Sequence, residues 1–314
     1  MTGSRILALG HYQPSRVVTN DDLAQFVETN DEWIRDRVGI ASRRIAGDET
    51  VADMAAAAAD KALANSGLTA ADIDLVVVAT CTSIDRSPNV ACRVAAKLGI
   101  TAPGAFDLNT ACSGFAYALG TVDHAIRAGA SRNAIVIGAE KLSDFTDWTD
   151  RSTCIIFADG AGAAVVTATA EGEPAGVGPV VWGSVPEKGD AVRIEGWRPY
   201  VKQEGQTVFR WATTELAPLA LRACERAGVA PSELAAFVPH QANTRIIDGI
   251  AKRLGIPNAI IAKDLIESGN TSAASVPLAL SKLVERREVP SGAPVLLFGF
   301  GGGLTYAGQV VRCP

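Results

Sequence analysis

One cysteine, Cys112, lies between an apolar run and an amphipathic run within residues 106–119 (FDLNTACSGFAYAL). The amphipathic run at 115–128 predicts a helix, so the thiol is expected at a sharp turn from strand to helix. A thiol at a helix N-terminus lies at the positive end of the helix dipole, which favours the thiolate, and the N–H groups there can receive an oxyanion. The pattern indicates a nucleophile; the alternative is a small buried apolar residue, the fate of most free cysteines.

Two further polar side chains follow predicted strands or turns in the second half of the chain. His240 comes directly after the apolar residues 234–239, and Asn270 lies in a polar turn before a predicted helix at 275–286. A glycine turn at 301–303 follows a strand predicted at 295–298. Open α/β sheets bind ligands at the carboxyl ends of their strands, so we expect these groups to converge with Cys112 in one active site. Taken alone, His240 is more typical of a structural histidine.

Alternating helical and strand-like segments predict an α/β scaffold that holds these groups. Residues 50–66 are alanine-rich, with Thr50 as the N-cap, Asp53 three residues on and Gly67 as the stop signal. Residues 74–80 form a continuous β-branched run, which is typical of a parallel sheet covered on both faces. The other predicted helices are 88–98, 213–227 and 244–254, the other predicted strands are 4–9, 133–138 and 155–167, and residues 171–206 are expected to be an irregular connection.

The two halves of the sequence resemble each other. Gly67 aligns with Gly228 at an offset of 228 − 67 = 161, and the residues around both glycines match. Two more matches lie at offsets of 156 and 161: LGI at 98–100 with 254–256, and VIG at 136–138 with LFG at 297–299. These matches predict a duplicated βαβαβ unit with halves at 1–170 and 171–314. The offset of 156 places residue 268, in the turn that carries Asn270, opposite Cys112.

The composition restricts the class of protein. The chain has 314 residues, 48% hydrophobic and 20% charged, which is enough to bury a large core. A formal net charge of −5 argues against nucleic acid as a main partner. The N-terminus lacks the apolar run of a secretory signal, and no run reaches the ~18 apolar residues of a membrane helix. Six scattered cysteines without a CxxC pattern indicate a cytoplasmic protein, and three histidines without ligand spacing predict no metal site.

Four motifs make the chain similar to the thiolase superfamily and, within it, to the β-ketoacyl-acyl-carrier-protein synthase III family. They are TACSGF around Cys112, VPHQANTRII at His240, GNTSAASVPLAL at Asn270 and GFGGGLTYAG near the C-terminus. The resemblance runs nearly end to end and implies a thiolase-like fold in which the two halves form five layers, α-β-α-β-α. Elongating synthases resemble this branch but use Cys–His–His, and thiolases use a second cysteine, a role that Cys313 does not fit.

The resemblance also implies a reaction without a cofactor. Cys112 takes a starter acyl group from acyl-CoA, and His240 and Asn270 hydrogen-bond the thioester of malonyl-acyl-carrier protein as it loses CO₂. The resulting carbanion attacks the acyl-Cys112 thioester in a Claisen condensation that starts fatty acid synthesis. The other implied roles are an oxyanion hole from the N–H groups of Cys112 and Gly302, Phe300 as a gating residue, a CoA site at Trp33, Arg37 and Arg151, and a carrier-protein face at Arg210, Arg245, Lys252 and Arg253.

The chemistry of these residue types agrees with the implied roles. An asparagine amide and an imidazole N–H can both donate to a thioester enolate, and the loss of CO₂ removes the need for a strong base. Trp33 taken alone is more typical of a core anchor than of a platform for a purine ring. Arg245 and Lys252 lie seven residues apart and share a helix face, which by itself indicates ordinary solvated charge. On a net-acidic chain, a local basic patch favours an acidic partner.

Several alternatives are open at this level. The loop at 82–88 (TSIDRSP) is more polar than family loops that close the acyl pocket, and the pocket residues within 193–204 are unassigned. The starter can therefore be acetyl, a branched short chain or an unusual acyl group. The competing functions are a priming or acyl-transferring ketosynthase of a polyketide pathway and a cysteine-dependent thioesterase. A homodimer is implied, with residues 109–111 and the loop before them at the interface.

Overall fold

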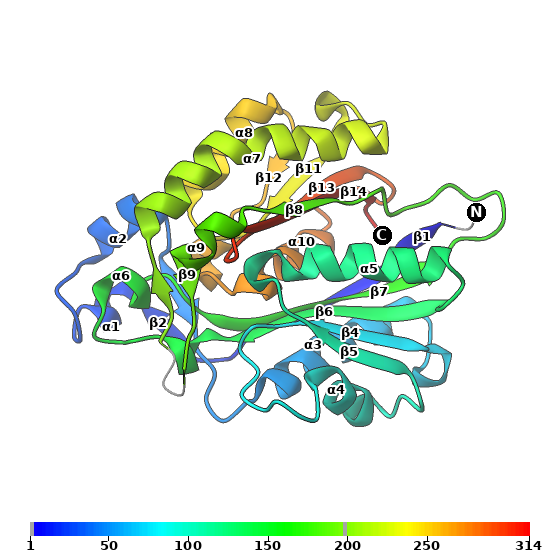
Figure 1. Cartoon of the computed structure of the whole chain (residues 1–314), viewed down its shortest axis with the longest axis horizontal. Coiled ribbons are helices and arrows are strands. Elements are labelled where there is room, and N and C mark those ends of the chain that lie inside the picture. Colours follow the sequence, from blue (N-terminus) through cyan, green and yellow to red (C-terminus); the bar gives the residue numbers. More distant parts are fainter. Residues whose placement is uncertain (1–2, 197–199) are drawn as a thin grey trace.

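The computed structural model describes residues 3–196 and 200–314, which form two five-stranded sheets within five layers (Figure 1). Helices α3 (Val51–Ser66) and α4 (Val90–Leu98) cover the outer face of the first sheet. Helices α5 (Gly114–Arg127) and α10 (Ser275–Glu285) lie between the sheets, and α7 (Gly205–Ala227) and α8 (Thr244–Leu254) cover the second sheet. This arrangement confirms the predicted α/β fold class and its α-β-α-β-α layers.

The two sheets have equivalent topologies. The first has the order β1-β7-β6-β4-β5, and the second, taken from β8, has the order β8-β14-β13-β11-β12. In each sheet the central strand, β6 or β13, pairs parallel with one neighbour and antiparallel with the other. Both sheets therefore repeat one pattern, and residue 170 falls between them. The strands are β1 (Ser4–Tyr12), β4 (Leu75–Ala79), β5 (Gly104–Leu108), β6 (Asn133–Lys141), β7 (Asp159–Ala168), β8 (Val181–Ser184), β11 (Ala236–Pro239), β12 (Ile260–Ile261), β13 (Pro294–Gly301) and β14 (Thr305–Arg312).

Short elements complete the fold. The turns that matter for the site are η2 (Ala111–Ser113), before α5, and η6 (Ser272–Ala274), before α10. The remaining elements are β2 (Val17–Thr19), α1 (Asn20–Leu23), α2 (Asp31–Val38), β3 (Ser42–Arg44), η1 (Ala70–Asp72), η3 (Leu142–Phe145), α6 (Arg151–Cys154), η4 (Pro186–Ala191), β9 (Val192–Arg193), β10 (Lys202–Gln203), η5 (Pro231–Glu233) and α9 (Leu265–Ser268).

Local sequence signals explain several boundaries. Helix α3 begins with the predicted capping box, in which Thr50 and Asp53 satisfy each other's backbone N–H groups, and it ends at Gly67 in the left-handed conformation. Helix α8 spans the predicted residues 244–254. The predicted start of α7 at residue 213 is wrong, because the helix already begins at Gly205 and buries Val208 and Trp211 in its extra turns. Strand β13 runs past its predicted end at 298 to Gly301, and β14 was not predicted.

The predicted register between the halves needs a correction around Cys112. The turns η2 and η6 occupy equivalent places, each directly before a central helix, and they are 161 residues apart. Their first residues, Ala111 and Ser272, share an unusual positive φ, 47° and 48°. Cys112 is therefore equivalent to Ala273, not to residue 268. The offset of 156 fails here because the connection between β12 and η6 differs in length from that between β5 and η2.

The core lies mainly between the two sheets, where α5 and α10 contribute Phe115, Leu119 and Leu280 to one cluster. A second cluster fills the space between the first sheet and the alanine-rich α3. Within the described residues, no helix combines the length and hydropathy required of a membrane span.

Candidate active site

The tight turn η2 holds Cys112 at the start of α5, half-buried and close to the end of β13. The residue before it, Ala111, adopts the left-handed conformation, which costs a non-glycine residue about 1 kcal/mol or more. Glycine is required opposite the thiol, because a Cβ at Gly301 would lie 2.8 Å from Cys112 Sγ. A Cβ at Gly299 would lie 2.8 Å from the Cα of Ser113. The glycines of the GFGGG motif therefore let β13 approach the nucleophile closely.

The environment of Cys112 corrects one prediction. Burial raises the pKa of the thiol to about 11, although hydrogen bonds from the N–H groups of Gly302 and Cys112 act in the opposite direction. The Ser272 hydroxyl also contacts the sulfur, but it donates its single proton to Glu140 at 3.0 Å, so it does not stabilise a thiolate. The helix N-terminus therefore does not yield a resting thiolate, because loss of hydration outweighs it. The sequence predicted an oxyanion hole formed by the N–H groups of Gly302 and Cys112. Both N–H groups lie within hydrogen-bonding distance of the Cys112 sulfur.

His240 directly follows β11, where its N–H donates to the Phe298 carbonyl at 2.8 Å. The imidazole is buried, and burial lowers its pKa to about 3, so the ring is neutral at physiological pH. Its Nδ1 lies 2.8 Å from Ser275 Oγ, which also accepts the Gln241 N–H. When the Ser275 hydroxyl, whose oxygen accepts the Gln241 N–H, donates its proton to Nδ1, the ring proton is on Nε2. His240 is then a neutral donor through Nε2.

Asn270 is fixed by its backbone and by one side-chain bond. Its N–H donates to the Ile156 carbonyl and its carbonyl accepts from the Ala158 N–H, both at 2.9 Å, so the turn is tied to the segment before β7. Its Oδ1 accepts the Ser272 N–H at 2.8 Å. This bond sets the orientation of the amide and leaves the two Nδ2 protons free to donate. Asn270 is only 4% exposed, so those donors act in a largely dehydrated site.

Shared neighbours bring Cys112, His240 and Asn270 to one place. Ser272 contacts the Cys112 thiol with its hydroxyl and Asn270 with its N–H. The Phe300 ring lies edge-on to His240, with centroids 5.3 Å apart, and the next residue, Gly301, packs on Cys112. The predicted convergence of these three side chains is therefore what the fold produces. Phe300 is buried beside the imidazole, between His240 and Trp211.

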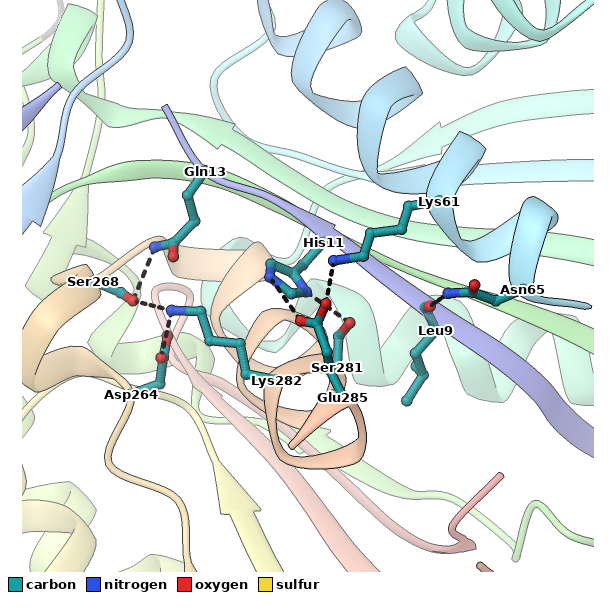
Figure 2. A network of polar contacts seen from close by, with 10 residues as sticks. All are labelled: Leu9, His11, Gln13, Lys61, Asn65, Asp264, Ser268, Ser281, Lys282 and Glu285. Carbon is teal, nitrogen blue, oxygen red and sulfur yellow. Dashed lines mark hydrogen bonds and ion pairs between the residues drawn. The ribbon is translucent and has the colours of Figure 1, made fainter. Parts of the chain in front are cut away.

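A polar network joins residues of the two halves and includes Ser268, close in the chain to Asn270 (Figure 2). Lys282 on α10 donates to Asp264 at 2.7 Å and to Ser268 at 2.9 Å, and Gln13 also donates to Ser268. Ser268 ends α9, two residues before Asn270. The Lys282 and Asp264 side chains are only 13% and 12% exposed, so the ion pair is largely dehydrated. In the same network His11 contacts Ser281 and Glu285, but burial lowers the pKa of His11 to about 4, so at neutral pH its contact with Glu285 is not an ion pair.

The residues predicted to bind CoA lie together at the rim of this region. The Arg151 guanidinium stacks over the Trp33 ring, 4.7 Å from its centroid, and the indole is 37% exposed, so Trp33 is not a core anchor. Because the two groups touch each other, a purine ring between them has to displace Arg151. Arg37 is exposed on α2, and its carbonyl accepts from Asn243, which caps the N-terminus of α8. Residues 240–243 thus link the buried imidazole to this rim.

The predicted carrier-protein residues occupy one surface made by α7 and α8. Arg245 lies over the Phe209 ring at 5.3 Å, and Arg253 donates to the Thr214 carbonyl, so both hold the two helices together. All four basic side chains are exposed: Arg210, Arg245, Lys252 and Arg253. This surface begins at the same α8 N-terminus that contacts the CoA residues.

Sequence reasoning missed three residues that support the site. Ser272 and Ser275 are the two serines of the GNTSAASVPLAL motif, and their hydroxyls contact Glu140 and His240, respectively. Glu140 is a fully buried carboxylate on β6, and the signal that could have revealed it is a charged residue inside an apolar strand. Of the unassigned pocket segment, residues 197–199 lie outside the described part of the chain. Among the described residues, no group of three histidine, cysteine or acidic side chains lies close enough together to hold a metal ion.

Comparison with known proteins places this geometry in a family. Residues 106–186 match the model for 3-oxoacyl-[acyl-carrier-protein] synthase III, and residues 224–313 match the model for its C-terminal part. The chain is 64% identical to β-ketoacyl-[acyl-carrier-protein] synthase III 4 of Streptomyces coelicolor, over 99% of both chains. It is 48% identical to β-ketoacyl-[acyl-carrier-protein] synthase III of Mycobacteroides abscessus, over 98% of this chain and 94% of that relative.

Two solved structures are similar throughout. The 3-oxoacyl-[acyl-carrier-protein] synthase III of Aquifex aeolicus superimposes with a TM-score of 0.94 at 40% identity, covering 99% of this chain and 100% of the other. A priming β-ketosynthase of a polyketide biosynthetic pathway superimposes with a TM-score of 0.97 at 42% identity, covering 99% and 96%. With its fold, its four motifs and these relatives, the chain belongs to the β-ketoacyl-acyl-carrier-protein synthase III family.

Proposed function

We propose that this chain condenses a starter acyl-CoA with malonyl-acyl-carrier protein and thereby initiates fatty acid synthesis. In the first step the Cys112 sulfur attacks the carbonyl carbon of the acyl-CoA thioester and forms a new C–S bond. The bond between that carbon and the CoA sulfur breaks, and the proton of the Cys112 thiol leaves with CoA as its free thiol. The N–H groups of Cys112 and Gly302 both reach Sγ, where an acyl carbonyl would be attached, which supports their role as an oxyanion hole.

In the second step malonyl-acyl-carrier protein loses CO₂. The electron pair of the broken C–C bond stays with the thioester and forms an enolate. The observation that carries this proposal is a pair of neutral side chains beside the nucleophile: Asn270, whose Oδ1 is bonded so that its Nδ2 protons can donate, and the neutral ring of His240, which donates through Nε2 when Ser275 donates to Nδ1. Neutral donors stabilise the enolate without attracting the carboxylate that must leave. The enolate carbon then attacks acyl-Cys112, a C–C bond forms, and the cysteine sulfur is released.

The substrates and partners follow from the surface beside the site. Trp33, Arg37 and Arg151 bind the adenine and phosphates of CoA at the rim that leads to His240. The four exposed cations of α7 and α8 receive the carrier protein, for which charge complementarity raises the rate of encounter. Phe300, packed edge-on against His240, gates the site.

The working unit in this proposal is a cytoplasmic homodimer. Strand β5 is an edge strand of the first sheet and carries Phe106, whose ring is 38% exposed. An open strand edge with an exposed aromatic residue is suited to pairing with a second copy, and β5 leads directly into residues 109–111. Sedimentation of the active enzyme as a monomer would contradict this part of the proposal.

A second candidate is a priming ketosynthase of a polyketide pathway, which the TM-score of 0.97 with such an enzyme favours. The two functions share the chemistry and differ in the carrier protein that accepts the product. A comparison of rates with malonyl groups on a fatty acid and a polyketide carrier protein separates them.

Mass spectrometry after incubation with mixed acyl-CoAs, followed by malonyl-acyl-carrier protein, tests the proposed reaction. We expect an acyl adduct on Cys112, then CO₂ release and a β-ketoacyl product, with no adduct in Cys112→Ala. Steady hydrolysis of acyl-CoA without the malonyl substrate would indicate a thioesterase instead. Acylation and transfer without CO₂ release would indicate an acyltransferase.

A further inference from the structure

The buried Glu140 carboxylate near the end of β6 has no part in the reaction described above. It is 0% exposed, and it accepts hydrogen bonds from Thr82 Oγ1 at 2.6 Å and from Thr80 Oγ1 at 3.1 Å. The Cys81 N–H donates to it at 3.1 Å, and the Cys81 thiol also contacts it. In the described part of the chain, the hydrogen bonds it accepts come from hydroxyl, thiol and N–H groups. Burial raises the pKa of Glu140, and these hydrogen bonds act against that rise by stabilising the carboxylate.

Ser272 connects this carboxylate to the reacting groups. Its hydroxyl donates to Glu140 Oε1 at 3.0 Å and also contacts the Cys112 thiol. Its N–H donates to Asn270 Oδ1 at 2.8 Å. Its backbone has a φ of 48°, a left-handed conformation that needs support from its surroundings. One serine therefore transmits the position and charge of Glu140 to both Cys112 and Asn270.

We propose that Glu140 is a positioning residue that, through Ser272, keeps the Cys112 thiol protonated in the resting enzyme and keeps the Asn270 amide turned toward the substrate. A serine hydroxyl has a single proton. While that proton is donated to Glu140, Ser272 offers only lone pairs to Cys112, so it can accept an S–H group but cannot stabilise a thiolate. The negative charge two hydrogen bonds away acts in the same direction and raises the pKa of Cys112.

This arrangement has a consequence for reactivity. Thiols react with oxidants and alkylating agents through the thiolate, so a protonated Cys112 is protected until acyl-CoA occupies the site. The titratable groups that face Glu140 are the Cys81 thiol, which follows β4, and the Cys112 thiol of η2. Its cross-strand neighbour on β7 is Gly160, and η6 contributes only the Ser272 hydroxyl.

Alkylation with iodoacetamide tests the charge effect without any substrate. The rate at Cys112 is followed from pH 6 to 10, below the Cys112 pKa of about 11, by peptide mass spectrometry, because Cys81 and Cys92 are also partly accessible. In Glu140→Gln, which keeps the shape and removes the charge, we expect the pKa of Cys112 to fall by about one unit or more. At a given pH in this range, the reaction is then about tenfold faster than in the wild type. An unchanged or lower rate would overturn the proposal.

Asp123→Asn is the matched control, because it removes another buried carboxylate, one near the opposite end of α5 that pairs with Arg127. It should leave the alkylation rate of Cys112 unchanged. An equal increase in this variant would mean that a general loss of stability, and not the loss of the Glu140 charge, exposes the thiol. Should Glu140→Gln fail to fold, Thr82→Val removes the 2.6 Å hydrogen bond and makes Glu140 easier to protonate. Alkylation near neutral pH should then also be faster, and an unchanged rate would refute the charge effect.

The effect on Asn270 rests on the proposed function and has its own assay. Ser272→Ala removes the bond to Glu140 but keeps the N–H that orients Asn270. We expect kcat for CO₂ release from malonyl-acyl-carrier protein to fall about tenfold with little change in KM, because the turn loses one support. A Ser272→Ala variant with the wild-type rate would refute this part. Absence of CO₂ release from the wild type would instead refute the proposed function and leave the alkylation result standing.

Discussion

Replacing Asn270 by alanine separates the two halves of the proposed reaction. The side chain is 4% exposed, and its Oδ1 is already bonded to the Ser272 N–H, so the free Nδ2 protons are what the substitution removes. Loss of one such donor from an oxyanion site costs about 2.7–4 kcal/mol, or 10²–10³ in rate. Acylation of Cys112 does not use this donor and should remain within about threefold of the wild type.

Asn270→Asp sharpens the same test. It keeps the shape and the acceptor for Ser272, but it places an oxygen where Nδ2 donates. Decarboxylation should fall below the level of Asn270→Ala, because an acceptor repels the enolate oxygen whereas a methyl group only fails to bind it. A merely structural role for Asn270 would predict the reverse order, with the isosteric Asp the milder change.

The assay measures the two steps separately in single-turnover mixtures. The acyl adduct on Cys112 is quantified by mass spectrometry, and CO₂ release is measured from malonyl-acyl-carrier protein labelled in its free carboxyl group. Equal losses in both steps would refute the division of roles. So would wild-type decarboxylation in Asn270→Ala.

Three further predictions concern the support, the stability and the partner surface. Lys282→Met leaves the largely buried Asp264 unpaired, so urea unfolding should show a free energy of unfolding lower by about 2–4 kcal/mol. A decrease below about 1 kcal/mol would mean that water already screens the ion pair. The pKa of His11 is lowered to about 4, so between pH 6.5 and 4 the unfolded chain binds a proton that the folded chain does not. The free energy of unfolding therefore decreases as the pH is lowered through this range, by up to about 1.4 kcal/mol per pH unit. His11→Gln should show a shallower slope, and an unchanged slope would contradict the burial argument. Arg245→Glu should raise KM for malonyl-acyl-carrier protein about tenfold without affecting acylation by acyl-CoA. Arg132→Glu, at an exposed position directly before β6 and not on α7 or α8, should change neither. Equal effects of the two charge reversals would mean that only net charge matters.

The sequence by itself contained the chemistry and the outline of the scaffold. Cys112, His240 and Asn270 each follow a strand or lie in a polar turn before a helix, and that local pattern is readable without any knowledge of contacts. The capping box at Thr50 and the paired stop signals at Gly67 and Gly228 mark helix ends through backbone geometry that depends only on nearby residues. The internal repeat predicted the two equivalent sheets, because similar sequences in the two halves form similar units.

Only the tertiary structure decided the electrostatics and the supporting contacts. The position of Cys112 at the N-terminus of α5 predicted a thiolate, yet burial against β13 and η6 raises the pKa of the thiol. That burial depends on segments up to nearly 200 residues away in the chain. The partners Glu140 and Ser272 lie 132 positions apart in the chain, and no local periodicity links them. The longer α7 and the unpredicted β14 have the same cause, because packing against the second sheet stabilises residues whose own sequence favours no structure strongly.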